Sequence, residues 1–183
     1  MTSRQQAWAL VTEYTHGDQL IRHMRSVEAA MRAYARKFGE DEERWGVTGL
    51  LHDFDYESDP GAHPERGLRI MRERGIPEET VLDSASHGDT GVARDTKLRQ
   101  ALFAVDELCG FIIACALVKP DRSLGAVDAR TVRKKMKDKA FARGVHRDEL
   151  LAGAELLGVD FDEHVEFVRD ALRPIAPDLG LNQ

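Results

Sequence analysis

Apolar residues recur every three or four positions along most of the chain, which is the spacing of one face of an α-helix. The clearest case begins at Leu20 and ends at Phe38, with arginines at intervening positions. It predicts an amphipathic helix from about Asp18 to Phe38, closed by Gly39. No stretch alternates apolar and polar residues as a half-buried strand would, so the pattern predicts an all-α fold.

The other elements follow from the same spacing and from the positions of glycine and proline. Residues 54–62 are rich in turn formers and are expected to form a loop. The chain has 183 residues, the length of one ordinary domain, so one globular unit is expected. The further predicted helices are about Asp41–Asp53, Pro64–Arg74, Pro77–Ser86, Asp95–Lys119, Asp128–Lys137, Arg147–Leu157 and Asp160–Leu172.

One run, Ala101–Val118, is long and apolar enough to suggest a membrane span. Asp106 and Glu107 lie near its middle, and each acid would cost about 2.5–3.5 kcal/mol at a bilayer centre. The central buried helix of a soluble domain is the better interpretation, and no membrane partner is expected. Asp106 then becomes a carboxylate in the core, which must be neutralised, paired or bound to metal.

Composition adds expectations about partners and compartment. The formal net charge of −6 argues against nucleic acid as the main partner. Cys109 and Cys115 lie six residues apart in the apolar run, too far apart on one helix for a disulfide, and are expected to be buried thiols. With no signal-like N-terminal segment, they favour a cytoplasmic protein. The oligomeric state stays open, and a homo-oligomer is compatible with the sequence.

Histidines and aspartates stand where apolar helices would not need them. His52-Asp53 ends a small, apolar helical run, and His23 lies beside the apolar face of the first long helix. His63 precedes one predicted helix and His87 follows another. Imidazole nitrogen and carboxylate oxygen together suit divalent Mn, Fe, Co, Ni or Zn, whereas Ca would take nearly all oxygen. A lone histidine is more often a satisfied polar group, so the expectation of a metal site depends on the whole set.

A histidine on one helix, then Gly-Leu-Leu-His-Asp, then an aspartate in Ala-Val-Asp-Glu-Leu, resembles the HD-domain superfamily of metal-dependent phosphohydrolases. The resemblance implies an HD-domain helical bundle with additional C-terminal helices. The single domain of residues 1–183 would then have a core of about 20–118 and a flank or cap of about 120–183.

Two further segments, His63-Pro64-Glu65-Arg66-Gly67 and Ser86-His87, look like the additional histidines of the binuclear branch that includes the HDIG and HD-GYP groups. Phe54-Asp55 stands in place of the Ile-Gly of HDIG, and no Gly-Tyr-Pro signature occurs. The resemblance therefore does not imply cleavage of cyclic dinucleotides.

Carried over residue by residue, the resemblance implies one or two divalent transition metals, with Asp53 bridging when both are bound. Two adjacent cations can activate a water near neutral pH and stabilise in-line phosphoryl transfer. A mononuclear site, without His63 and His87, remains open. The six implied ligands are His23, His52, Asp53, His63, His87 and Asp106.

A basic segment could hold an anionic substrate. Between Arg130 and Arg147 there are eight Lys or Arg residues and one acid. Such a run is usually a solvated helix face; the functional alternative is that Lys134, Lys135 and Lys137 bind the substrate. Asp55, two residues after the ligand pair, is the first candidate for proton transfer.

The expected function is a metal-dependent phosphohydrolase that cleaves a phosphate ester or anhydride of a nucleotide-like or other small phosphorylated metabolite with a metal-bound hydroxide. Asp53 and Asp55 are its candidate catalytic residues. Two alternatives stay open. One is an HD-type mixed-valence di-iron oxygenase, whose ligand set is the same, and the other is a metal-stabilised nucleotide-binding regulatory module without turnover.

Overall fold

The computed structural model describes residues 2–183, which contain helices and no β-strand. One isolated β-bridge joins Ser123 to Asn182. The prediction of an all-α fold is confirmed. The chain divides into two compact units, one up to Leu102 and one from Phe103 to Gln183, with the boundary inside α6 (Lys97–Leu117). The organisation as a single domain with a core to about residue 118 stays a prediction.

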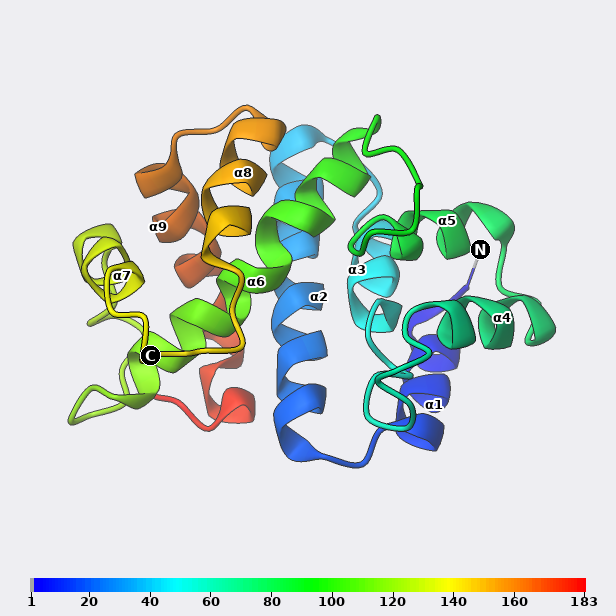
Figure 1. The fold of residues 1–183 in the computed structure, drawn as a ribbon, viewed down its shortest axis with the longest axis horizontal. Helices are drawn as coiled ribbons and strands as arrows, with labels where there is room; N and C mark the ends of the chain where they lie inside the picture. The colour runs from blue at the N-terminus through cyan, green and yellow to red at the C-terminus, as the bar shows by residue number, and fades with distance from the viewer. Residues whose placement is uncertain (1) are drawn as a thin grey trace. The chain divides into compact units, whose positions relative to one another are not determined.

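The first unit is built mainly from five helices (Figure 1). Its core includes Met24, Leu50, Phe54 and Met71, all nearly inaccessible to solvent. The predicted helices of this unit are present, with ends shifted by a few residues. The five are α1 (Arg4–Tyr14), α2 (Asp18–Phe38), α3 (Glu42–Leu51), α4 (Glu65–Glu73) and α5 (Glu78–Ala85).

The closest helix pair in this unit is α2 and α3, which lie side by side in Figure 1. A Cβ built on Gly49 of α3 would lie 3.0 Å from Met31 Cγ and 3.1 Å from the Val27 carbonyl oxygen, both on α2. The missing side chain therefore allows the two backbones to approach. This contact helps to fix the distance between His23, in the second turn of α2, and His52, at the end of α3.

The sequence analysis did not predict α1. Only Ala7, Leu10 and Val11 of its eleven residues are buried, so its apolar face is too short to stand out. Ser3 and Gln6 form a capping box at its start. The Ser-x-x-Gln pattern is the signal that would have predicted this helix.

The second unit contains most of α6 and the C-terminal helices. Asp128 and Asp160 cap α7 and α9 by accepting hydrogen bonds from backbone N–H groups, as helix-starting aspartates do. The C-terminal elements are α7 (Ala129–Met136), α8 (Arg147–Leu157), α9 (Phe161–Leu172) and the 3₁₀ helix η1 (Arg173–Leu179).

Among the described residues, α6 is the one helix whose length and composition would suit a membrane span. Most of its apolar window is buried, as in the core helix of a soluble protein. Cys109 and Cys115 form no disulfide and are buried, as predicted. His164 on α9 is buried, with its Nε2 2.9 Å from the Ala104 carbonyl oxygen.

Candidate metal centre

Four histidines and one aspartate of the first unit converge on one place. His23 lies in the second turn of α2, and His52 and Asp53 directly follow α3. His63 precedes α4, and His87 follows α5. The structure thus brings five of the six predicted ligands together, in two groups that share Asp53.

Asp53 faces both groups. Its Oδ2 lies 3.6 Å from Nε2 of His23 and 3.5 Å from Nε2 of His52. Its Oδ1 lies 3.2 Å from Nε2 of His63 and 3.4 Å from Nε2 of His87. Each carboxylate oxygen therefore belongs to one histidine pair, an arrangement suited to a ligand that bridges.

Hydrogen bonds at Nδ1 orient three of the rings. His52 Nδ1 donates to the Gly49 carbonyl oxygen over 2.8 Å, and His87 Nδ1 to that of Ser84 over 2.6 Å. His63 Nδ1 lies 2.8 Å from Asp55 Oδ1. With the proton held at Nδ1, the lone pair of a neutral ring is at Nε2, on the side of Asp53. This is the usual way in which proteins orient histidine ligands of metals.

The donor atoms have the spacing of ligands that share a cation. The Nε2 atoms lie 3.2 Å apart in the His23–His52 pair and 3.0 Å apart in the His63–His87 pair. Two nitrogens at about 2.1 Å from one ion lie about 3.0 Å apart at a right angle and about 3.4 Å apart at a tetrahedral angle. The residues present therefore fit a divalent cation, and the nitrogen and oxygen donors suit the borderline transition metals.

Charge is balanced within the cluster by the imidazoles. Burial raises the pKa of the Asp53 carboxyl, but the surrounding histidines, led by His52, hold it well below its ordinary value. Burial lowers the pKa of His63, but its hydrogen bonds to Asp53 and Asp55 outweigh this and raise the pKa to about 9. In the metal-free protein His63 is therefore positively charged at neutral pH. A metal ion that binds to it must displace the extra proton.

Asp55 is buried behind His63. Besides the bond to His63, its Oδ2 accepts the Gly67 backbone N–H over 2.7 Å. A Cβ on Gly67 would lie 2.6 Å from Asp55 Oδ1, so only glycine leaves room for the carboxylate here. Both carboxylate oxygens of Asp55 thus form hydrogen bonds within the protein. These contacts favour an orienting role toward His63, while proton transfer to a substrate stays a prediction.

The predicted family was tested by comparison with known proteins. Residues 20–108 match the family model of the HD domain. Over this stretch the chain is similar to the HD domain. Members of this family are generally metal-dependent hydrolases that bind divalent metals. The match does not specify a branch, so the resemblance to the HDIG and HD-GYP groups stays a prediction.

The matched segment of the HD domain spans just under half of the chain and includes all five clustered residues. Comparisons with curated proteins and with solved structures found no match. The finer properties of the site therefore depend on its own geometry.

Arg94 holds the segment that carries His87. Its Nε donates to the Ser86 carbonyl oxygen over 2.7 Å. Its Nη2 donates to those of His87 and Gly88 over 3.1 and 3.2 Å. These carbonyls lie just beyond the end of α5, where no helical N–H group is available to them, and the guanidinium supplies the donors. The sequence analysis missed Arg94, because no spacing pattern distinguishes it from a surface arginine.

Two arginines hold α5 itself in place. Asp83 on α5 is fully buried and accepts from Arg44 of α3 and Arg99 of α6, each over 2.8 Å. A buried carboxylate between two guanidinium groups is compensated, whereas either arginine alone would leave it partly unpaired. The ion pairs therefore fix α5, and with it His87, relative to α3.

The remaining predicted site residues lie in the second unit. Asp106 is on α6 and is only partly buried, not enclosed in the core as expected; its role as a metal ligand stays a prediction. Lys134 and Lys137 line one cavity. Lys135 does not: its Nζ lies 4.5 Å from the centre of the Phe141 ring. The structure thus separates Lys135 from the two other predicted substrate-binding lysines.

Another group of possible ligands lies in the second unit, formed by Glu107, His146 and Glu149. His146 is largely exposed, and its Nδ1 lies 2.7 Å from Glu107 Oε1. This hydrogen bond raises the pKa of His146, and a surface ion pair accounts for the contact.

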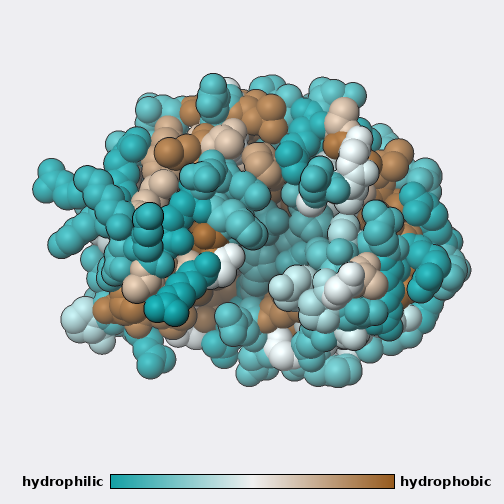
Figure 2. All heavy atoms as spheres, in the orientation of Figure 1, coloured by the Kyte–Doolittle hydropathy of each residue, from teal (hydrophilic) through white to brown (hydrophobic). Residues whose placement is uncertain are grey.

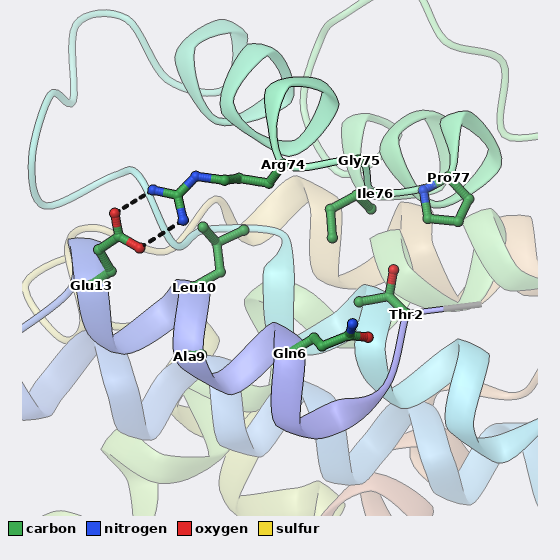
Figure 3. Close-up of a pocket in the computed structure, with 9 residues that line it drawn as sticks. All are labelled: Thr2, Gln6, Ala9, Leu10, Glu13, Arg74, Gly75, Ile76 and Pro77. Atoms are coloured by element: carbon green, nitrogen blue, oxygen red, sulfur yellow. Dashed lines mark hydrogen bonds and ion pairs between the residues drawn. The ribbon is translucent and has the colours of Figure 1, made fainter.

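A hollow of about 350 Å³ lies in the first unit between α1 and the turn from α4 to α5 (Figure 3). The bidentate ion pair of Glu13 with Arg74 closes one end, and Leu10 and Ile76 supply apolar surface. None of the clustered histidines lines this hollow, so it is separate from the candidate metal centre.

Proposed function

We propose that this protein is a metal-dependent phosphohydrolase that acts on a nucleotide-like or other small phosphorylated metabolite. The observation that carries the proposal is the Asp53 carboxylate between two histidine pairs, each at ligand spacing. Such a donor set, in a family of metal-dependent hydrolases, suits two divalent ions that share one carboxylate.

In this proposal His23 and His52 hold one ion and His63 and His87 the other. Asp53 would contribute to both sites, and Asp106 would complete the set as the resemblance implies. When bound, the metal ions supply an activated water and electrostatic stabilisation of the phosphoryl group. The metals are Fe, Mn, Co, Ni or Zn, the ions that this mixture of donors accepts.

The protein residues contribute orientation. Asp55 fixes the ring of His63 through Nδ1, and backbone carbonyls fix those of His52 and His87. Because these rings are held before a substrate arrives, the cost of ordering them belongs to folding and not to catalysis. We assign Asp55 to this positioning role.

The test is replacement of Asp53 by alanine. We expect the Asp53→Ala protein to lose both metal retention, measured by elemental analysis, and phosphate release from a panel of nucleotides and sugar phosphates. The control is Asp59→Ala, which removes an exposed carboxylate from the same loop. Full metal content with undiminished turnover in Asp53→Ala would contradict the proposal.

The same assay separates the alternatives. The iron-loaded protein, prepared without oxygen, is tested for oxygen uptake and for phosphate release. Oxygen consumption without phosphate release would replace the hydrolase by an oxygenase. A nucleotide that stays bound and intact after prolonged incubation with each metal form would indicate a binding module.

A further inference from the structure

One face of α7 is basic over its whole length. Arg130, Arg133, Lys134 and Lys137 follow the spacing of residues on one side of a helix. They line a cavity of about 390 Å³ together with Asp162. Figure 2 shows hydrophilic residues over the part of the visible face where α7 lies in Figure 1.

The cavity holds an excess of positive charge. Arg133 is paired, since its Nε lies 2.6 Å from Asp162 Oδ1. Its guanidinium also lies 4.8 Å from the centre of the Phe161 ring, which fixes its position. The side chains of Arg130, Lys134 and Lys137 form no hydrogen bond or ion pair within residues 2–183.

The spacing of these cations destabilises α7. Arg130 and Lys134 are four residues apart, and so are Arg133 and Lys137, and like charges at this spacing repel. The helix dipole stabilises a cation at the C-terminal end of α7, such as Lys137, but not Arg130 in the first turn. An anion bound in the cavity would relieve the repulsion, and no acid other than Asp162 lines it.

The geometry points to a binding site for the phosphate chain of a small di- or triphosphate compound. We propose that Arg130, Lys134 and Lys137 bind its phosphates and that the fixed guanidinium of Arg133 orients them. Three unpaired cations match an anion of three or four negative charges better than a single phosphate of about two. The first and last of them are seven residues apart, about 10 Å along the helix, which suits an extended anion.

A small ligand fits this site better than nucleic acid. The volume lies within the range of small-molecule sites. The net charge of −6 opposes a long polyanion, which would contact much more of the surface. The site lies wholly within the second unit, and its existence does not depend on activity at the candidate metal centre.

The test measures binding of inorganic tripolyphosphate by calorimetry in 150 mM salt. The full-length Asp53→Asn protein is used, so that metal ions at the shared carboxylate do not contribute. We expect tripolyphosphate to bind at least tenfold more tightly than inorganic phosphate. Combining Arg130→Gln with Lys134→Gln should weaken binding at least tenfold, and both positions are exposed, so the fold should be kept.

Lys134→Gln alone, compared with Lys135→Gln, gives a charge-matched control, because each removes one positive charge from the same helix and Lys135 lies outside the cavity. Lys135→Gln should change the affinity by less than twofold. Equal weakening by Lys135→Gln, or no tripolyphosphate binding at millimolar concentration, would overturn the proposal. Tighter binding of an oligonucleotide than of tripolyphosphate would reassign the surface to nucleic acid.

ATP in place of tripolyphosphate distinguishes the source of the phosphates. Affinity at least tenfold higher for ATP identifies a nucleotide, and similar affinities identify recognition of the phosphate chain alone; both support the site. A failure here leaves phosphate release by the metal centre untouched, since that is measured on the unmodified chain.

Discussion

The Asp53 carboxylate presents one oxygen to each histidine pair, so one side chain links groups that come from four segments of the chain. The histidines around it differ in the hydrogen-bond partner of Nδ1. His52 and His87 are oriented by backbone carbonyls, which no substitution of a side chain removes. His63 is oriented by Asp55, a side chain. The Nδ1 hydrogen bond of His63 is therefore the one that replacement of its partner side chain can remove directly.

Replacement of Asp55 by asparagine tests this orientation. The amide cannot accept from both His63 and Gly67, so we expect metal affinity at the His63–His87 pair to fall about 10- to 100-fold, as for other partners of metal ligands. Competition with a chromophoric chelator measures the loss. In the metal-free variant, NMR titration should show a lower pKa for His63, because a hydrogen bond that raises it is gone. Asp59→Asn is the control, and an unchanged His63 pKa would argue against the orienting role.

The raised pKa of His63 predicts opposite pH trends for stability and metal affinity. Because its pKa rises from 6.5 to about 9 on folding, His63 stabilises the metal-free protein fully below pH 6.5. This stabilisation is lost as the pH rises through about 9. Metal affinity should rise over the same interval, because less proton must be displaced. Urea unfolding and metal titration between pH 6.5 and 9.5 measure the two trends, and parallel trends would contradict the assignment.

At the scale of elements, the close approach of α3 to α2 at Gly49 determines the distance between His23 and His52. Gly49→Val should force the helices apart and lower the free energy of unfolding by about 1–3 kcal/mol. It should also weaken metal binding at His23 and His52. Gly144→Ala is the matched control, because a Cβ there meets no atom within 4 Å. Denaturant unfolding and elemental analysis measure the effects; an unaffected metal content in Gly49→Val would show that the spacing is not critical.

The end of α5 depends on Arg94 in a similar way. Arg94→Gln removes a charged donor from three successive carbonyls, so we expect a loss of about 1–3 kcal/mol in the free energy of unfolding. Metal content should fall by the ion that His87 helps to hold. Arg69→Gln, at an exposed position on α4, controls for loss of charge. Loss of stability with full metal content would assign Arg94 a structural role alone.

At the scale of the whole molecule, hydrophobic spacing was enough to predict the helices that bury a broad apolar face. It failed for α1, whose buried face has three residues. It also gives no sign that His164 is buried, since one polar residue in a helix does not reveal a buried backbone carbonyl as its partner. Helix content follows from local pattern, whereas the partners of single polar groups follow from packing.

The clustered histidines could be predicted because the family resemblance coincides with the positions of three of them at helix ends and of His23 beside the apolar face of α2. The roles of Arg94 and Gly67 could not, since both act on atoms that only folding brings near: three carbonyls at the end of α5 and the Asp55 carboxylate. The grouping of Lys134, Lys135 and Lys137 followed from charge alone. Because successive residues point in different directions around a helix, Lys135 lies outside the cavity, beside Phe141.

The hydrogen bonds that hold the Nδ1 atoms of these histidines affect both the rate of metal uptake and the heat-capacity change that accompanies it. The rings of His52, His63 and His87 are immobilised by the fold, so an arriving ion displaces protons and water but reorders few side chains. The entropy of arranging the ligands is lost once, during folding. Uptake should therefore be limited by shedding of water from the ion, and the heat capacity of the protein should change little when the site fills.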